Sequence, residues 1–309
     1  MIAGFFGREN NLQFEANVVF EDTPPLFESR NVNLKDMQID VIIPTFNRAS
    51  VLPKAIASVI EQSFQDFQLY IIDDGSTDET RSVVEKYLQN QKVHYFHQKN
   101  QGVSSSRNHG IKISSSEWIC FLDSDDEWLP QKLATQSAFS ENNPQFNFIH
   151  SNEIWIRNGI RVNAKARFDK GSQDLFKRSL ELCLISPSTV MLKRELIQKH
   201  NYFDETFEIC EDYDLWLKIL ATEEVGFISE NLIKKYGGHE DQLSTKYPAM
   251  DFWRIRSMIK LLSTIGNGQK REQLQLEIEK KSLVLMQGFE KHQQHQKKIE
   301  LLNLLKLLP

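Results

Sequence analysis

The pattern of apolar and polar positions predicts alternating strands and helices in the first half of the chain. Residues 39–45 form a short apolar run rich in β-branched side chains, typical of a strand buried on both faces. Apolar positions then recur at helical spacing across 49–63. Further strands are predicted at 68–73, 92–96 and 118–122, with helices at about 77–89 and 103–114. Strands separated by helices indicate a parallel sheet with right-handed crossovers.

The pattern is less regular after Pro130. A helix at about 131–140 precedes a stretch at 146–156 that we interpret as a pair of strands. A short strand at 188–192, a helix containing 211–220 and the segment VGFISENLIKKY at 225–236 follow. We expect this half to add mixed strands and loops over the sheet. We therefore predict an N-terminal extension at 1–38, a main domain at 39–245 with halves at 39–133 and 134–245, and a helical C-terminal region at 246–309.

Polar, turn-forming segments follow the four strands predicted in the first half: PTFNR (44–48), DDGS (73–76), HQKNQG (97–102) and DSDD (123–126). Parallel sheets bind ligands beyond these strand ends. The carboxylates of DSDD repel one another unless a cation or hydrogen-bond donors hold them ionised. Two carboxylates suit Mg²⁺ or Mn²⁺ bound together with a nucleoside diphosphate. The alternative is that Ser124 or Asp126 caps the following helix.

The DDGS segment also carries candidate binding residues. Gly75 permits a tight turn, and the polar residues after it can cap a helix, but neither role requires Asp73 or Asp74 to be acidic. An aspartate at a strand end can accept hydrogen bonds from a base or a ribose. Phe46, after the neighbouring strand, offers an aromatic face on which a base can stack.

Composition excludes few classes of protein. Of 309 residues, 26% are charged and 40% hydrophobic, which is ordinary for a globular protein. The net charge of −5 provides no overall attraction for nucleic acid, although it leaves room for a local basic groove. Three cysteines without CxxC spacing indicate reduced, buried thiols. No stretch is long enough to span a membrane, and MIAGFF is too short for a signal-peptide core. We therefore expect a cytoplasmic protein.

Four segments together resemble the nucleotide-binding half of family 2 glycosyltransferases with the GT-A fold: VIIPTFNR, IIDDGSTDET, NQGVSSSRNHGI and FLDSDDEWLP. The resemblance spans about 40–133 and weakens afterwards, where CEDYDLWLK and YGGHEDQLS match. It implies an α/β fold: a single Rossmann-like domain whose mostly parallel central sheet is flanked by helices, with a C-terminal helical extension. It also implies inverting transfer of a sugar from a nucleoside diphosphate donor to a hydroxyl acceptor. A UDP-sugar is the donor that the family favours, and GDP- and dTDP-sugars are the alternatives. The setting that it implies is bacterial polysaccharide or lipid-linked oligosaccharide synthesis.

The resemblance also implies roles for matching positions. Thr45, Phe46 and Arg48 would frame the base, Asp74 would hydrogen-bond it, and Asp73 would support that loop. Arg107 would either contact the phosphates or order its own loop. The complete set implied for donor binding is Pro44, Thr45, Phe46, Arg48, Asp73, Asp74, Gly102, Arg107, Asp123 and Ser124. The ligands implied for Mn²⁺ or Mg²⁺ are Asp123, Asp125 and His239, and His239 would either complete the metal shell or contact the diphosphate.

Inverting transfer needs a carboxylate that takes the proton of the acceptor hydroxyl. The resemblance places this base in the pair Glu211–Asp212, and we take Asp212 first and Glu211 second. Without the upstream motifs, the pair reads as acidic residues stabilising a helix N-terminus. Trp216, one turn later, is either a platform for an acceptor sugar or, as is commoner beside leucines, a core residue.

Other functions remain as alternatives. A metal-dependent nucleotidyltransferase would need a glycine-rich phosphate loop after the first strand, and PTFNRASVLPKA has no glycine. A noncatalytic nucleotide-sugar-binding protein of the same fold would not need the carboxylates. An NAD-dependent oxidoreductase is disfavoured because no GxGxxG follows the first strand. KKIELLNLLKLL (297–308) indicates either an interfacial membrane helix or, more commonly, a helix packed on its own domain or a second copy.

Overall fold

The structure is a computed structural model that describes residues 37–163, 165–171, 174–238 and 249–308. Residues 36–309 form one compact unit. The extension predicted at 1–38 lies almost wholly outside the described residues, and the predicted domain boundaries stay predictions. No helix in the described ranges is long and apolar enough to cross a membrane.

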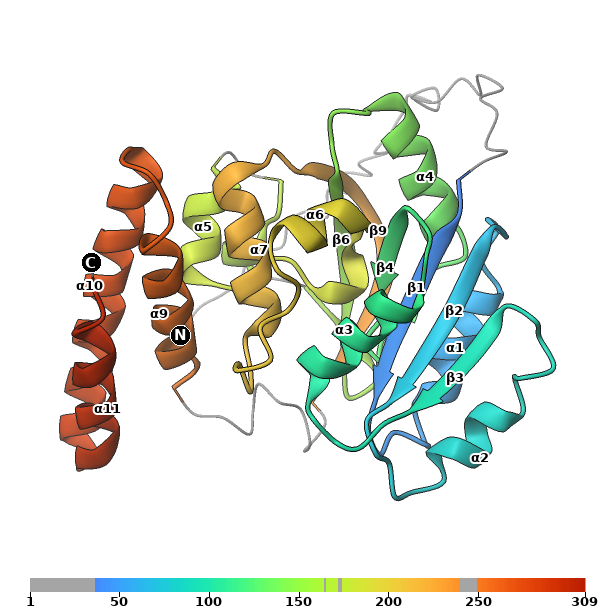
Figure 1. The fold of residues 1–309 in the computed structure, drawn as a ribbon, viewed down its shortest axis with the longest axis horizontal. Coiled ribbons are helices and arrows are strands. Elements are labelled where there is room, and N and C mark those ends of the chain that lie inside the picture. The colour runs from blue at the N-terminus through green and yellow to red at the C-terminus, as the bar shows by residue number, and fades with distance from the viewer. Residues whose placement is uncertain (1–36, 164, 172–173, 239–248, 309) are drawn as a thin grey trace, which may run out of the picture. The chain divides into compact units, whose positions relative to one another are not determined.

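The predicted parallel sheet is present (Figure 1). Its strands are β1 (Ile39–Thr45), β2 (Phe67–Asp73), β3 (Val93–His97) and β4 (Trp118–Phe121). Strand β1 lies between β2 and β4 and is parallel to both, and β3 is parallel to β2. The crossovers are α1 (Leu52–Ile60), α2 (Thr80–Glu85) and α3 (Val103–Ile113). The mixed α/β fold with this sheet is the one expected from the sequence.

The second half extends the same sheet. The order among the described strands is β3-β2-β1-β4-β8-β6-β9-β5, with β7 paired to β6. The added strands are β5 (Glu127–Trp128), β6 (Phe148–Arg157), β7 (Ile160–Val162), β8 (Met191–Lys193) and β9 (Gly226–Gly237). Strand β8 is antiparallel to β4 and β6, whereas β9 is parallel to β6 and antiparallel to β5. Strand β5 therefore returns to the sheet beside the end of β9.

Two elements differ from the sequence-based expectation. The pair of strands predicted at 146–156 is wrong, because 148–157 form one continuous strand with an irregular register around Asn152. The strand runs on through its polar residues, because Ser151 is fully buried and Glu153 has a buried carboxylate. The strand predicted at 188–192 is mainly a 3₁₀ turn, Pro187–Thr189, followed by β8.

Helices cover both faces of the sheet. On one face α1, α2 and α4 (Lys132–Asn142) pack on Val41 and Ile43 of β1. On the other face α3 and α7 (Glu211–Thr222) pack in the cluster that contains Ile42. A Cβ atom at Gly110 of α3 would lie 2.6 Å from a methyl of Ile42, so glycine permits this close approach. Helix α3 is thereby held against the centre of the sheet.

The remaining helices continue this second layer. They are α5 (Leu175–Glu181), α6 (Arg194–Lys199), α9 (Met250–Leu262), α10 (Gln269–Lys291) and α11 (His295–Leu305). Helix α9 packs on α7 and α10, and α10 in turn packs on α5 and α11. Leu274 and Ile278 of α10 and Leu301 of α11 are buried in the same core as α7. The C-terminal helical region is therefore continuous with the core that supports α7.

Candidate active site

The loops after β1 and β2 are joined at the edge of the sheet. Thr45 pairs in register with Asp73, and the backbone N–H of Asn47 donates to Oγ of Ser76 over 2.8 Å. Asn47 has φ +52°, a left-handed conformation that asparagine tolerates better than most residues. The side chain of Phe46 is 45% exposed. The ring predicted to stack on a base is therefore accessible.

Asp73 and Asp74 have different surroundings. Asp73 is fully buried, and its carboxylate accepts hydrogen bonds from Ser76 N (2.8 Å) and Tyr95 Oη (2.6 Å). Burial, followed by this hydrogen bond, raises the pKa of Tyr95. Asp73 therefore ties the start of its loop to β3.

Asp74 holds the loop that leads into α3. Its Oδ1 accepts from Gln98 Nε2 (2.8 Å) and Gln101 N (3.0 Å), and its Oδ2 accepts from Gly102 N (2.7 Å). Gly102 has φ +92°, which favours glycine, and it directly precedes the helix. A base that hydrogen-bonds Asp74 would use a remaining lone pair of Oδ2.

Three further positions predicted for donor binding lie at the same edge. Pro44 is buried within β1. The backbone N–H of Arg48 donates to Oγ1 of Thr80 over 3.1 Å, which joins the first loop to α2. Ser124 is 8% exposed. Pro44 and Ser124 therefore expose little side chain at this edge.

Arg107 joins the two halves of the unit. From α3, its Nη2 contacts Asp123 Oδ1 at 2.7 Å and its Nη1 contacts Glu211 Oε1 at 2.5 Å. Its side chain is only 3% exposed and lies over the ring of Phe203. Burial lowers its pKa, but Asp123 and Glu211 together raise the pKa above its ordinary value. Arg107 thus links its own helix to the loop of Asp123 and to the start of α7, and both roles implied from the sequence stay predictions.

Asp126 anchors the DSDD loop from inside the protein. It is 2% exposed, and its carboxylate accepts from Ser188 Oγ (2.7 Å) and Tyr236 N (3.1 Å). Burial, and next the charge of Asp125, raises its pKa well above the usual range. The capping alternative is wrong, because α4 begins with no side-chain cap. Ser188 also accepts a hydrogen bond from Asp123 N (3.1 Å).

Asp123 and Asp125 remain as metal-ligand candidates. The side chain of Asp123 is 28% exposed, and Asp125 is half-buried. Within the described ranges, no group of three or more His, Cys, Asp or Glu is arranged to hold a metal. Carboxylate oxygens are ligands that Mg²⁺ and Mn²⁺ accept together with phosphates and water, so Asp123 and Asp125 fit such an ion. His239, the predicted third ligand, lies outside the described residues.

The two candidate bases at the start of α7 differ in access. Glu211 is 6% exposed and bonded to Arg107; burial, opposed by Arg107, raises its pKa to about 7. Asp212 is half-buried, and its Oδ2 accepts from the thiol of Cys183 at 3.3 Å. The carboxylate of Glu211 is bonded to Arg107, so Asp212 is the better placed of the two to take the proton of an acceptor hydroxyl.

Trp216 is buried in the core. Its side chain is 2% exposed and packs against Phe148 and Phe203, with ring centroids 5.0 and 5.8 Å away. The acceptor alternative for Trp216 is therefore wrong, and the core alternative describes it. The residue lies one helical turn from Asp212, but on the inward side of α7.

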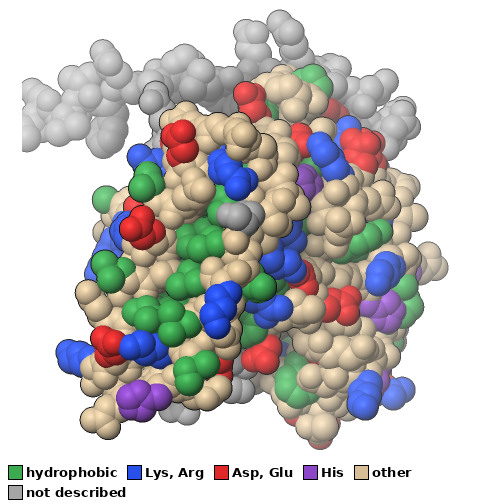
Figure 2. All heavy atoms as spheres, turned by 60° about the vertical axis from the view of Figure 1, so that its left-hand side comes forward, with side chains coloured by type: hydrophobic (Ala, Val, Ile, Leu, Met, Phe, Trp, Pro, Cys, Tyr) green, Lys and Arg blue, Asp and Glu red, His purple; other side chains and the backbone are tan. Residues whose placement is uncertain are grey.

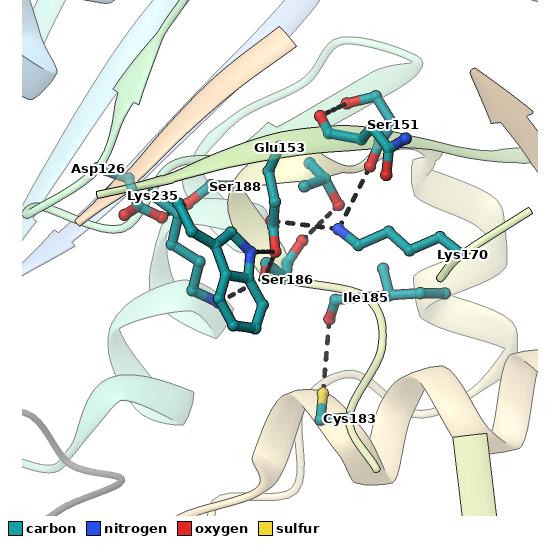
Figure 3. Close-up of polar contacts among 12 residues, drawn as sticks. Asp126, Ser151, Glu153, Lys170, Cys183, Ile185, Ser186, Ser188 and Lys235 are labelled. Atoms are coloured by element: carbon teal, nitrogen blue, oxygen red, sulfur yellow. Dashed lines mark hydrogen bonds and ion pairs between the residues drawn. The ribbon is translucent and has the colours of Figure 1, made fainter. Parts of the chain in front are cut away.

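Sequence reasoning missed a polar cluster beside the DSDD loop (Figure 3). Its main members are Glu153, Lys170, Ser186 and Lys235. Lys170 contacts Glu153 Oε2 at 3.1 Å, and both side chains are 4% exposed. None of these residues belongs to a recognisable motif. The only signal in the sequence is the polar segment HSNE inside an otherwise apolar stretch.

Comparison with known proteins identifies the family. The family model described as "Glycosyl transferase family 2" matches residues 40–200, more than half of the chain. The chain belongs to this family. The family 2 chain is 30% identical over 214 residues to an Escherichia coli protein named UDP-Glc:alpha-D-GlcNAc-diphosphoundecaprenol beta-1,3-glucosyltransferase WfgD. That match covers 69% of this chain and 81% of WfgD.

Other relatives of this family 2 chain are longer. An uncharacterized glycosyltransferase from Rickettsia bellii is 36% identical over 203 residues, and the match covers 65% of this chain but only 29% of the relative. A similar protein from Rickettsia felis is 35% identical and matched over 33% of its length. The chain thus corresponds to about a third of these relatives.

Solved structures show that this family 2 chain has the GT-A fold. Staphylococcus aureus TarS 1–349, in complex with UDP-GlcNAc, superposes with a TM-score of 0.72 at 21% identity, covering 88% of this chain and 82% of TarS. The mannosyltransferase PcManGT from Pyrobaculum calidifontis, in complex with GDP-Man and Mn²⁺, gives a TM-score of 0.58 at 14% identity. That match covers 78% of this chain and 69% of PcManGT.

Proposed function

We propose that this family 2 chain transfers a sugar from a UDP-sugar to a hydroxyl of a lipid-linked saccharide, with inversion at the anomeric carbon. One observation carries the proposal: Arg107 contacts both Asp123, one of the two candidate metal ligands, and Glu211, next to the candidate base Asp212. The donor-binding edge and the base are thereby held together. WfgD, named as a UDP-Glc glucosyltransferase acting on a diphosphoundecaprenol-linked sugar, supports the choice of donor and acceptor.

The proposed reaction assigns a step to each group. Asp212 accepts the proton of the acceptor hydroxyl while that oxygen attacks the anomeric carbon. The bond from this carbon to the diphosphate oxygen breaks, and its electron pair leaves with the diphosphate. Asp123 and Asp125 would hold Mg²⁺ or Mn²⁺, which supplies Lewis-acid stabilisation of the phosphates when bound. Arg107 holds Glu211 away from the reaction, so the neighbouring carboxylate acts as base.

A nucleotide-binding screen tests this function. UDP, GDP and dTDP are titrated by calorimetry into wild type and Asp125→Ala, with Mn²⁺ and with EDTA. We expect wild type to bind UDP preferentially and only with the metal, and Asp125→Ala to bind it at least about tenfold more weakly, because one of two metal carboxylates is lost. Glu117→Ala is a matched control, since Glu117 is an exposed carboxylate at the opposite end of β4. Equal, metal-independent binding by wild type and Asp125→Ala would contradict the proposal.

We place the enzyme in the cytoplasm, at the inner membrane surface, where a lipid-linked acceptor lies. Hydrophobic side chains gather on the face that carries α10 and α11, with Lys and Arg around them (Figure 2). Leu276, Leu283 and Val284 of α10 are 60–67% exposed. Residues 269–308 contain eight Lys and Arg against five Glu, although the whole chain has a net charge of −5. An apolar face with a basic border suits an anionic bilayer.

Vesicle sedimentation tests this membrane contact. Replacing Leu276 and Leu283 together with Glu removes apolar area and adds negative charge, so binding to vesicles of phosphatidylglycerol and phosphatidylcholine should fall at least about tenfold. Leu88→Glu is the control, because Leu88 is 41% exposed away from these helices. If the double variant instead converts a dimer to a monomer in light scattering, a second copy covers this face and the membrane proposal is wrong.

A further inference from the structure

Lys235 lies at the end of β9, directly beside the DSDD loop. Its two neighbours are tied to that region: Lys234 pairs with Glu127 across β5, and Tyr236 N donates to Asp126 Oδ1 over 3.1 Å. The side chains of Lys234 and Tyr236 both contact the carboxylate of Glu127, at 2.5 and 2.7 Å. Because successive side chains of a strand point to opposite faces, Lys235 projects to the other face.

The ammonium group of Lys235 uses one of its three N–H donors in a hydrogen bond. Its Nζ donates to Oγ of Ser186 over 2.5 Å, and Ser186 in turn donates to Glu153 Oε1 over 3.3 Å (Figure 3). Among the described residues, no carboxylate oxygen lies within the 4.0 Å of an ion pair with Lys235. An ammonium has three N–H donors, so two remain after Ser186 is counted.

The carboxylates around Lys235 already have other partners. Glu153 is paired with Lys170 at 3.1 Å and accepts from Trp155 Nε1 over 2.9 Å. Asp126 accepts from the hydroxyl of Ser188. Burial lowers the pKa of Lys235, but Glu153 and Asp126 raise it above its ordinary value, so the side chain stays charged at neutral pH. A half-buried cation with spare donors is suited to receive an anion.

Lys235 also lies near the candidate base. The thiol of Cys183 donates to Asp212, and the charges of both Asp212 and Lys235 act on this same thiol. The segment from Cys183 to Ser186 therefore connects the base to the ammonium group. The charges of Asp126 and Asp123 also act on Lys235, so its ammonium group lies beside the loop that would hold a sugar diphosphate.

We propose that Lys235 binds the β-phosphate of the donor and stabilises the departing diphosphate through its two remaining N–H donors. The inference rests on the proposed function and adds to it a residue that contacts the leaving group. Lys235 keeps its proton throughout: the electron pair of the broken bond passes to the phosphate oxygen, and the ammonium stabilises that charge by hydrogen bonding.

Calorimetric titration of UDP and of uridine, both with Mn²⁺, tests the assignment. Lys235→Met should bind UDP about 10- to 100-fold more weakly than wild type, because a charge-assisted hydrogen bond to phosphate is lost. Uridine carries no phosphate, so its affinity should be unchanged. Lys234→Met is the matched control, since Lys234 is bonded to Glu127 on the opposite face, and it should bind UDP within about twofold of wild type. Lys235→Gln is measured alongside, because it keeps a donor for Ser186 if Lys235→Met fails to fold.

The outcomes separate the two proposals. If wild type binds UDP with Mn²⁺ and the folded Lys235 variants bind it equally well, Lys235 does not contact the phosphate while the proposed function stands. An equal loss of UDP and uridine affinity would show that Lys235 only supports the fold, and would overturn the inference. If wild type binds none of UDP, GDP and dTDP, the proposed function fails and the role of Lys235 fails with it.

Discussion

Replacing Asp212 with Asn is expected to lower the turnover number for sugar transfer by about 10²- to 10⁴-fold, the usual contribution of a general base. The amide keeps the size of the side chain but cannot accept the hydroxyl proton. Donor affinity should stay near that of wild type, because Asp212 contacts Cys183 and is not one of the proposed metal ligands. Turnover is measured with UDP-glucose and a diphosphate-linked GlcNAc acceptor, and donor affinity by titration.

Two further variants test whether the loss of turnover belongs to Asp212 and not to a neighbouring carboxylate. Glu208→Gln is the control, since Glu208 is exposed three residues before α7 and should leave turnover unchanged. Glu211→Gln retains a hydrogen-bonding partner for Arg107, so it should reduce turnover far less than Asp212→Asn. Near-normal turnover of Asp212→Asn would remove Asp212 from the role of base, and a larger loss in Glu211→Gln would transfer that role to Glu211.

Replacing Arg107 with Met is expected to destabilise the protein by about 3–5 kcal/mol, which is typical when one partner of a buried ion pair is removed. The change leaves Asp123 and Glu211 facing each other without the cation that separates them. Arg107→Lys should recover little of this stability, because a single ammonium group cannot contact two carboxylates as the forked guanidinium does. The free energy of unfolding in urea measures this loss.

A double variant and a surface variant test the Arg107 prediction further. Combining Arg107→Met with Glu211→Gln should recover part of the stability, because one uncompensated buried charge is removed. Arg81→Met should cost less than about 1 kcal/mol, since Arg81 is 73% exposed and its pair with Glu85 lies on the surface. A loss in Arg107→Met no larger than that in Arg81→Met would show that Arg107 does not hold the two halves together.

The nucleotide-binding half was predictable because its signals are local. Runs such as 39–45 indicate buried strands by composition, and helical spacing identifies the crossovers. Parallel strands joined by helices must end at one edge, so the adjacency of the segments after β1, β2 and β4 follows from chain topology. The exposure of Phe46 at this edge agrees with that reasoning.

The second half was harder to predict because its polar residues are buried against partners distant in sequence. The pattern at 146–156 predicts two strands, but the structure has one. Glu153 lies within this single strand, and Lys170 pairs with its charge. The sequence favoured the core for Trp216, and its contacts with Phe148 and Phe203 decided it. A pattern along the chain contains no information about such long-range pairs.

The amino-acid sequence by itself determined the order of strands and helices in the first half, the family, and the acidic segments that end the strands. These depend on local periodicity and on residue types at fixed spacing, so they can be read without coordinates. Only the tertiary structure decided that Arg107 occupies Glu211, that Asp126 anchors its loop, and that Lys235 projects beside it. The physical reason is that burial and charge pairing are set by neighbours in space, which the fold brings together from distant positions.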